Sequence, residues 1–597
     1  MAPSTSCFLM VSFPSQGHIN PSLALAKRFL RTDFQVTFAT SKSALRRMHK
    51  PQQETPDGLS YESFSDGYDD GFDFGVYDIQ QFMDSLKTRG PETLRDLIDD
   101  YLRDGRKKIV HVFYTTLIPW VADVARSFGL RSTLVWTQPA TVLDIYYYYF
   151  NGHGDAIRTG STDPSSPILL PGLPPLNGKD VPSFFAPENH YTYFLPLMKR
   201  QFEILDEQQG QSHKVLVNTF EALEEGPLHV IPKLNLVGIG PLLPYAFLDR
   251  HNPSDTSFGG DLFRGNSKNY IEWLDTKPGA SVIYLSFGSI HVLKKKQKDE
   301  LTKALILCGL PFLWVMRETA KNDMEGEEEE EEEQLIYGDE LERQGMVVPW
   351  CAQVEVLSHP SIGCIVTHCG WNSTSESLAC GVPMVAFPQW VDQKTNAKLI
   401  EDVWRTGVRL KTTEAGDGIV VAEEIRRCVE LVMRGGNKGE EIRKNASKWK
   451  ELAMEATREG REKEKEREKT YWQLLSPSPA PLHSSQNGGR QVDAGVHALA
   501  NVYHIYVERI SKRKPGEVLS PHEPAVVKRA INQFLQTDER DIMVVETSVS
   551  FEKDRAWHVR EVLDVKAMQE ACKVLVGHHD FSSFRQQDVR LTRLLGH

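Results

Sequence analysis

Side chains that could bind a ligand are concentrated in one stretch of the chain, Trp350–Gln393. The indole that opens it, Trp350, can stack on a flat nucleobase. The short apolar run Cys364–Thr367 predicts a buried strand, and the residues after the turn at Gly370 predict a helix. The start of such a helix leaves backbone N–H groups unpaired and presents the positive end of its dipole to an anion such as a diphosphate.

Three more polar side chains of this stretch suit the sugars of such a ligand. Glu376 lies one turn inside the predicted helix, where its carboxylate can accept hydrogen bonds from two ribose hydroxyls. Asp392 and Gln393 offer acceptors and a donor for further sugar hydroxyls. The residue types therefore indicate a nucleotide-sugar site. The plainer interpretation is an ordinary strand–helix unit with buried aromatic residues.

From its opening Trp to its closing Gln, the stretch resembles the full-length signature box of plant UDP-dependent glycosyltransferases. The resemblance implies that a UDP-sugar is held by Trp350, Cys351, Ala352, Gln353, His368, Gly370, Trp371, Asn372, Ser373, Glu376, Asp392 and Gln393. It implies UDP-glucose rather than UDP-galactose, because a closing Gln usually accompanies glucose in this family. Neither a cofactor nor a metal ion is expected.

The resemblance also covers an N-terminal segment, SQGHINP, which contains His18. We expect it to form a loop between a strand at Ser6–Phe13 and a helix that starts at Asn20-Pro21, where open α/β sheets bind ligands. The family's general base matches His18. Its neutral imidazole would take the acceptor proton while UDP leaves and the anomeric centre inverts. An isolated histidine is otherwise usually structural.

One position departs from the family pattern. The family places an Asp behind the base, in a Tyr-Asp-Ser stretch before a Pro-Trp pair, and Thr115 occupies that position here. A hydroxyl can orient the imidazole, but it cannot offset a developing positive charge as a carboxylate would. Two interpretations stay open. Either the acceptor is acidic, as a phenol or carboxylic acid is, or Thr115 and a sugar hydroxyl share the positioning of the base.

The same resemblance assigns a role to two further positions. Ser289, in an SFGS turn, resembles a residue that contacts the diphosphate, and Thr137 matches a position near the glucose. The aromatic run Tyr146–Phe150 forms either the lining of an acceptor pocket or one half-buried face of a helix.

Apolar strands alternate with helical segments in two successive parts of the chain, which predicts buried parallel sheets of doubly wound α/β topology. The resemblance implies the GT-B arrangement, in which two Rossmann-like domains face a cleft. We expect an acceptor-binding domain at 1–240, an interdomain linker at 241–264 and a UDP-sugar-binding domain at 265–460.

The chain changes character after residue 460. Residues 461–487 predict a charged, Pro/Ser-rich linker in place of the family's final helix, which normally crosses back to the first domain. Within it, the alternating charges of Arg461–Lys469 predict either a solvated helix or a disordered segment. Within 488–597, DAGVHALANV and GHHDFSSFR resemble TruA-type tRNA pseudouridine synthases, and Asp493 matches that family's nucleophile. We expect a truncated, partial α+β appendage. Its 16 Lys and Arg against 15 Asp and Glu lack the positive excess that RNA binding needs.

The leading hypothesis is an inverting enzyme that transfers glucose from UDP-glucose to a small plant metabolite. The acceptor would be a flavonoid or anthocyanin phenol, or a carboxylic acid such as abscisate or an apocarotenoid acid. The alternatives are an RNA-modifying or RNA-binding protein that acts through the appendage, and an inactive fusion.

The composition is ordinary for a soluble protein, and we expect a monomer in the cytoplasm. The net charge of −12 is mostly local, because the acidic run Glu325–Glu333 supplies eight negative charges. The eight cysteines show no metal-binding spacing. No signal peptide and no run of ~18 apolar residues is evident. The expected partners are UDP-glucose and a small-molecule acceptor, without nucleic acid and without membrane insertion.

Overall fold

The computed structural model describes most of the chain up to residue 475 and four short strands beyond it. The described ranges are 5–31, 34–48, 55–72, 78–104, 107–163, 166–186, 193–208, 214–248, 255, 257–263, 269–289, 293–316, 338–412 and 418–475, with strands at 504–510, 518–519, 556–558 and 589–592. The acidic run Glu325–Glu333 and Asp493 lie outside the described residues. Met1–Tyr471 forms one compact unit and Trp472–His597 another.

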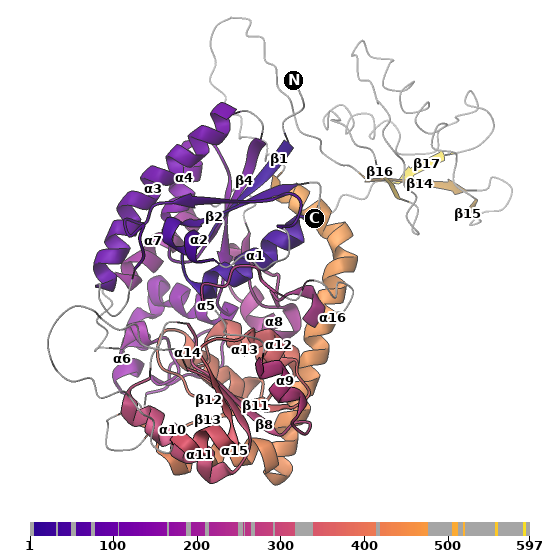
Figure 1. Ribbon diagram of the computed structural model, residues 1–597. Helices are drawn as coiled ribbons and strands as arrows, with labels where there is room; N and C mark the ends of the chain where they lie inside the picture. Colours follow the sequence, from indigo (N-terminus) through magenta and orange to yellow (C-terminus); the bar gives the residue numbers. More distant parts are fainter. Residues whose placement is uncertain are drawn as a thin grey trace, which may run out of the picture. The chain divides into compact units, whose positions relative to one another are not determined.

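The first lobe of the larger unit contains a seven-stranded parallel sheet in the order β3-β2-β1-β4-β5-β6-β7 (Figure 1). Its strands are β1 Thr5–Val11, β2 Gln35–Ser41, β3 Leu59–Phe64, β4 Lys107–Thr115, β5 Ser132–Trp136, β6 Val215–Val217 and β7 Leu236–Gly238. Its helices are α1 Gln16–Phe29, α2 Lys42–Arg47, α3 Ile79–Asp104, α4 Trp120–Ser127, α5 Ala140–Tyr148, α6 Gly154–Thr162, α7 Phe194–Glu207 and α8 Glu221–His229. Short helical turns are η1 Tyr149–His153, η2 Ser183–Phe185, η3 Pro232–Leu234 and η4 Tyr245–Phe247.

The second lobe contains a six-stranded parallel sheet in the order β10-β9-β8-β11-β12-β13. Its strands are β8 Val282–Ser286, β9 Phe312–Val315, β10 Met346–Val348, β11 Ile362–Thr367, β12 Met384–Ala386 and β13 Gly407–Arg409. Its helices are α9 Asn269–Asp275, α10 Lys295–Cys308, α11 Gly338–Gln344, α12 Gln353–Leu357, α13 Trp371–Cys380, α14 Gln393–Lys398 and α15 Ala422–Arg434, with the turn η5 Leu399–Val403.

Helices cover both faces of each sheet, so the central strands are buried. All residues of β5, β8 and β11 are buried, as expected for parallel strands packed on both sides. In each sheet the strand order reverses between two neighbours, β1 and β4 in the first and β8 and β11 in the second. Ligands bind outside the carboxyl ends of strands at such reversals. The two doubly wound sheets confirm the predicted fold class.

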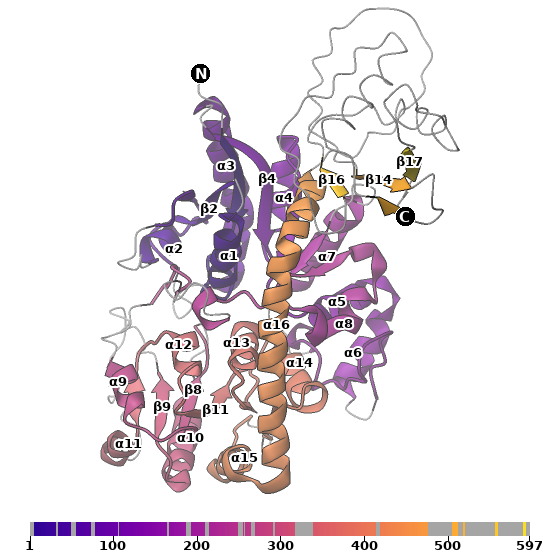
Figure 2. The same ribbon diagram turned by 90° about the vertical axis from the view of Figure 1, so that its right-hand side faces the viewer.

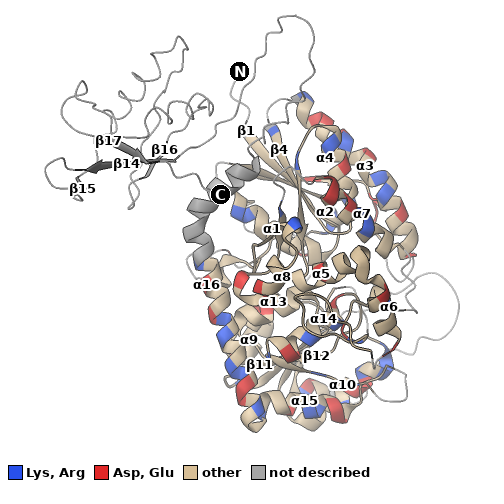
Figure 3. Cartoon of the chain, turned by 180° about the vertical axis from the view of Figure 1, so that it is seen from behind, with Lys and Arg blue, Asp and Glu red and all other residues tan. Residues whose placement is uncertain are grey.

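The prediction that the final helix is replaced was wrong. Helix α16, Gly436–Leu475, continues through the charged segment and passes from the second lobe along the first (Figure 2). The charged part of α16 consists mostly of Glu, Lys and Arg, which are strong helix formers. Their helix propensities add up along the segment. In the first half of α16, the indole N–H of Trp449 donates to the Trp404 carbonyl at 3.1 Å, which anchors the helix to the second lobe. On the face of the molecule seen in Figure 3, Lys and Arg are intermixed with Asp and Glu along α15 and α16.

The smaller unit contains four antiparallel strands. They are β14 His504–Ile510, β15 Val518–Leu519, β16 Ala556–His558 and β17 Val589–Thr592, and each of the last three pairs with β14.

Candidate active site

A cavity of about 310 Å³ lies between the two lobes, at the carboxyl ends of the strands where both sheets reverse order. Its wall contains all the residues predicted to hold a UDP-sugar and the predicted base. These are His18, Thr137, Ser289, Trp350, Cys351, Ala352, Gln353, His368, Gly370, Trp371, Asn372, Ser373, Glu376, Asp392 and Gln393. Thr115, the position predicted behind the base, does not line the cavity.

Helix α13 begins at the cavity, directly after β11. Its first backbone bond runs from the Thr374 N–H to the Gly370 carbonyl, so the N–H groups of Trp371, Asn372 and Ser373 precede the intrahelical ladder. The described wall contains carboxylates but no Lys or Arg. Within the described wall, the groups suited to an anion are the N–H groups at the start of α13 and the hydroxyls.

His368 is held tightly between two glycines at the same end of the cavity. A Cβ atom at Gly370 would lie 2.4 Å from its Nε2, and a Cβ atom at Gly288 would lie 2.6 Å away. Gly288 also has a φ of +81°, which side chains with a Cβ rarely adopt. Residues 288 and 370 must both be glycine for the imidazole to fit. This explains why the turn after β8 and the turn after β11 each contain a glycine.

A hydrogen-bonded group of side chains fixes Glu376. Gln353 Nε2 donates to Glu376 Oε2 at 2.6 Å and to Ser373 Oγ at 2.9 Å, while Gln353 Oε1 accepts from the Tyr284 hydroxyl at 3.1 Å. Burial raises the pKa of Glu376 to about 7, although the bond from Gln353 acts in the opposite direction. The carboxylate is oriented before any ligand arrives.

The closing pair of the box is shaped in a similar way. Asp392 Oδ2 accepts from Asn396 Nδ2 at 2.7 Å, and burial raises the pKa of Asp392 to about 6. Gln393 Oε1 accepts the backbone N–H groups of Gln389 and Trp390 at 2.9 and 3.0 Å, so its amide oxygen is already used. What the Gln393 side chain can still offer to a ligand is its amide N–H₂.

Two aromatic members of the box have different surroundings. Trp350 lies against the Phe263 ring, with 4.7 Å between centroids. Trp371 is 4% exposed, and its indole N–H donates to the Asn218 carbonyl of the first lobe at 2.7 Å. Trp371 therefore joins the lobes, a role that its place in the signature box does not indicate.

His18 lies in the first turn of α1 and not in a loop, because the helix begins at Gln16. The predicted helix start at Asn20 was wrong: the Ile19 N–H already bonds the Ser15 carbonyl at 2.9 Å. Burial lowers the pKa of His18 to about 3. Neither ring nitrogen is hydrogen-bonded to any part of the chain that the structure describes, and Nδ1 is buried. The imidazole is therefore neutral at physiological pH.

The predicted orienting bond from Thr115 to His18 is absent. Thr115 is fully buried at the end of β4, and its Oγ1 accepts the Phe13 N–H at 2.9 Å. The next residue, Thr116, lines the cavity, and its hydroxyl lies 3.3 Å from that of Thr137. Sequence reasoning missed Thr116; the signal was the alternation of side chains at the end of a strand, which separates neighbours.

A proline in α1 frees a carbonyl for the other lobe. The N–H of residue 21 would normally donate to the carbonyl of Gly17, but Pro21 has no N–H. The side-chain amide of Asn372, at the start of α13, donates to that carbonyl at 3.1 Å. The residue before His18 is thereby connected to the predicted diphosphate-binding helix end.

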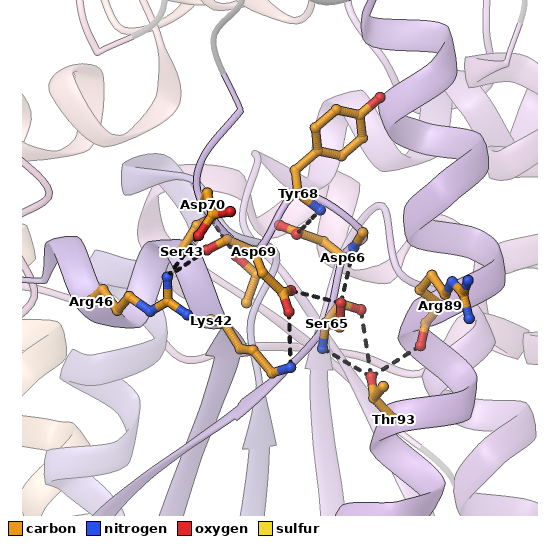
Figure 4. A network of polar contacts seen from close by, with 12 residues as sticks. Lys42, Ser43, Arg46, Ser65, Asp66, Tyr68, Asp69, Asp70, Arg89 and Thr93 are labelled. Carbon is orange, nitrogen blue, oxygen red and sulfur yellow. Dashed lines mark hydrogen bonds and ion pairs between the residues drawn. The ribbon is translucent and has the colours of Figure 1, made fainter.

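A network of polar contacts in the first lobe surrounds Asp69 (Figure 4). Asp69 accepts from Lys42 of α2 at 2.9 Å and from the Ser65 hydroxyl at 2.7 Å, which fixes the loop after β3. That loop carries an aromatic ring, Phe72, at 4.4 Å from Phe82. Phe82 in turn meets Phe13, whose ring is 5.1 Å from His18.

The aromatic run Tyr146–Phe150 does not line the cavity; of its two interpretations, the helix face is correct, and Tyr146 is fully buried. The aromatic wall on the first-lobe side comes instead from Phe13, Trp136, Phe184, Tyr193 and Phe194. These residues come from four separate segments, so no local pattern in the sequence could bring them together.

Among the described residues there is no cluster of His, Cys, Asp or Glu that could hold a metal ion. Nor does any described helix have the length and apolar character needed to cross a membrane.

Comparison with known proteins agrees with this geometry. The family model "UDP-glucoronosyl and UDP-glucosyl transferase" matches residues 263–449. The structure of Os79 from O. sativa in complex with UDP covers 75% of this chain and 95% of its own, at 33% identity and a TM-score of 0.65. The fold is therefore that of the GT-B glycosyltransferases.

Curated plant relatives extend the similarity. Crocetin glucosyltransferase, chloroplastic, from Gardenia jasminoides is 53% identical over 453 residues, which are 76% of this chain and 94% of its own. Phloretin 4'-O-glucosyltransferase from Malus domestica is 52% identical over 462 residues, with 76% and 94% covered. Anthocyanidin 3-O-glucoside 5-O-glucosyltransferase 1 from Perilla frutescens is 51% identical, with 75% and 94% covered. The chain belongs to the UDP-glycosyltransferases of plant type, enzymes that use a UDP-sugar donor without a metal cofactor.

We predict that Pro21→Ala weakens catalysis without weakening the fold. The new N–H competes with Asn372 for the Gly17 carbonyl, and a lost neutral hydrogen bond of about 1 kcal/mol corresponds to a roughly fivefold lower kcat/KM. The measurement is kcat/KM together with the melting temperature, in Pro21→Ala, Asn372→Ala and the double variant. Because both changes remove one contact, the losses should not add. Additive losses would contradict this account.

The buried carboxylates predict a pH dependence of donor binding. Ionised Glu376 and Asp392 accept hydrogen bonds from hydroxyls, so affinity for UDP-glucose should fall as the pH drops through about 7 and about 6. The ligand-free protein should instead become more stable over that range, because protonation removes the cost of burying the charge. Calorimetric titration and melting curves at several pH values test this. Glu376→Gln should remove the step near pH 7, and an unchanged profile would refute the assignment.

Proposed function

We propose that this protein is an inverting glucosyltransferase that moves glucose from UDP-glucose to an acidic hydroxyl or carboxyl of a small plant metabolite, with His18 as general base. The observation that carries the proposal is the 3.1 Å bond between Asn372 and the Gly17 carbonyl. It brings the residue beside the base to the helix end that is suited to the diphosphate.

The donor assignments follow from the chemistry of the cavity wall. Trp350 would stack on uracil, and Glu376 would accept the ribose hydroxyls. The start of α13 and the hydroxyl of Ser289 would bind the diphosphate. Asp392 and the amide N–H₂ of Gln393 would hold glucose, with Thr137 on the opposite wall.

The reaction is a single in-line displacement. The acceptor oxygen forms a bond to the anomeric carbon while the bond from that carbon to the UDP oxygen breaks, and UDP leaves with the electron pair. A neutral His18 removes the acceptor proton as the new bond forms. The glycosidic configuration is thereby inverted.

The state of His18 favours an acidic acceptor. A base with a lowered pKa is a weaker proton acceptor, and among the described residues no carboxylate hydrogen-bonds the buried Nδ1 to stabilise the protonated ring. Phenols and carboxylic acids release a proton far more readily than alkyl alcohols. Relatives named for glucosylating phloretin and an anthocyanidin glucoside agree with a phenolic acceptor. A flavonoid or anthocyanin phenol is therefore the first acceptor to test, followed by carboxylic acids such as abscisate.

We propose a cytoplasmic monomer in which the C-terminal unit takes no part in transfer. The relative from Gardenia jasminoides is named as chloroplastic, so a fluorescent fusion of the full chain is the direct test of location. For pseudouridine synthase activity, the position that matters is Asp493, and it lies outside the described residues.

The first prediction of this proposal concerns His18→Ala. Transfer to a phenol should fall by roughly 10²–10⁴ because general-base catalysis is lost. Transfer to a carboxylic acid, already ionised at neutral pH, should change little. The measurement is kcat/KM for one phenol, one carboxylic acid and one alkyl alcohol.

His111→Ala is the matched control for that experiment. His111 is also buried with a pKa of about 3, but it bonds Thr133 inside the sheet and does not line the cavity. An equal loss with all three acceptors in His18→Ala, or the same pattern in the control, would overturn the role of His18 as base.

A second prediction concerns the appendage. A chain that ends at Leu475 keeps the whole of α16 and should retain glucosyl transfer and its melting temperature, because every cavity residue belongs to the larger unit. A matched chain that ends at Gly435 lacks α16 and should lose both. Inactivity of the longer truncation alone would show that the appendage is needed.

A further inference from the structure

One segment of the first lobe is fastened to the second lobe beside the proposed glucose site. We call Asn177–Phe185, between α6 and α7, the interlobe strap. Its Asp180 side chain is 1% exposed and meets a cation of the second lobe: Arg409 Nη1 donates to Oδ1 at 2.7 Å. The ammonium of Lys398 lies 4.0 Å from Oδ2. The Asn177 N–H donates to the same Oδ2 at 3.0 Å, so both carboxylate oxygens are engaged.

Main-chain carbonyls of the strap are bound from the same side. Thr395 of α14 donates its hydroxyl to the Asp180 carbonyl at 2.7 Å. Arg409 Nη2 donates to the Lys179 carbonyl at 2.6 Å. Because α14 begins with Gln393, the helix that carries a proposed glucose ligand is fixed to the other lobe along its length.

A second attachment lies next to the sugar-binding pair. The Ser183 N–H donates to the Val391 carbonyl at 2.9 Å, and the Val391 N–H donates to Ser183 Oγ at 2.7 Å. Val391 has a φ of +58°, an unfavourable conformation for a β-branched residue. The reciprocal bonds hold it there, immediately before Asp392.

The strap also forms the aromatic wall of the acceptor side. Phe184 follows Ser183, lines the cavity and stacks on Phe194 with 3.5 Å between ring centroids. Through consecutive residues, one segment therefore contacts both the loop that precedes Asp392 and the wall against which an acceptor would lie.

We propose that Asp180 is a positioning residue for glucosyl transfer: with Arg409 it holds the interlobe strap so that the glucose and the acceptor keep one fixed relation. Asp180 touches neither substrate. The proposal rests on the proposed glucose-binding role of Asp392 and Gln393. When the strap loosens, UDP-glucose still binds, but the acceptor oxygen is displaced from the anomeric carbon and water takes its place. Water then forms the bond to that carbon, UDP leaves, and the products are free glucose and UDP.

The decisive variant is the double change Asp180→Asn with Arg409→Gln. A single change removes one charge of the 2.7 Å pair and leaves the other without it, whereas the double change removes both charges and leaves polar amides, of which Asn matches Asp in size and Gln is shorter than Arg. The matched control is Lys27→Gln with Asp255→Asn. It neutralises another ion pair of 2.7 Å between similarly shielded side chains, 19% and 12% exposed, outside the strap.

The experiment uses the full chain, UDP-glucose and a phenol. Glucoside and UDP are both quantified, affinity for UDP is measured by calorimetry, and the melting temperature is recorded with UDP. In the double variant, kcat should fall about 10- to 100-fold, since a displacement of about 1 Å can cost that much. The UDP released per glucoside should rise, while affinity for UDP stays within about twofold because α13 and Trp350 are untouched. The control should match the parent in every readout.

Three results would overturn the proposal. The first is parental kcat with one UDP released per glucoside in the double variant. The second is a joint loss of UDP affinity, melting temperature and kcat, which would make Asp180 merely structural. The third is the same pattern in the control.

Gln393→Glu is measured in parallel, because it keeps an acceptor for two backbone N–H groups while it replaces the amide donor by a carboxylate oxygen. Unchanged kinetics with UDP-glucose there would refute the proposed glucose site. Loss there together with a parental Asp180/Arg409 double variant would refute the strap alone.

Discussion

The hydrogen bond from Asn372 to the Gly17 carbonyl is the contact on which the geometry of the site depends. Each sheet places its strand reversal at its own carboxyl edge, and neither edge alone contains both a base and an anion-binding helix end. The two edges form one site only if the lobes keep a fixed distance. Pro21 makes this possible by leaving one helical carbonyl without its internal donor. The Trp371 indole bonded to the Asn218 carbonyl reinforces the same relation.

The electrostatics of the cavity follow from its lack of cations. The described wall contains Asp261, Glu355, Glu376 and Asp392, and no Lys or Arg. Burial raises the pKa of two of these carboxyls, Glu376 and Asp392. In the proposed complex, sugar hydroxyls donate hydrogen bonds to the ionised carboxylates, and the diphosphate meets the helix N–H groups.

The sequence predicted well that the residues of the signature box would line one cavity, because most of them lie in one stretch. A strand, a turn and a helix fix their relative positions locally, so Trp350 to Gln393 could be placed without knowing the fold. Contacts between distant segments could not be predicted in this way. The hydrogen bond from the Phe13 N–H to Thr115 joins residues that are 102 positions apart in the sequence. The contact of the interlobe strap between Arg409 and Asp180 joins residues that are 229 positions apart. The start of α1 was missed because a proline at an interior position was interpreted as a helix start.

The missing carboxylate at position 115 is consistent with the rest of the site. Thr115 satisfies a buried backbone N–H that would otherwise have no partner, and it leaves His18 in an apolar surrounding beside Phe13. An Asp there would bury one more negative charge near a cavity whose carboxyls already have raised pKa values. The imidazole accordingly remains neutral without a counter-ion, at the cost of being a weaker base. A neutral, weak base suffices when the acceptor itself gives up its proton easily. The Thr at position 115 and the proposed acidic acceptor therefore fit one another.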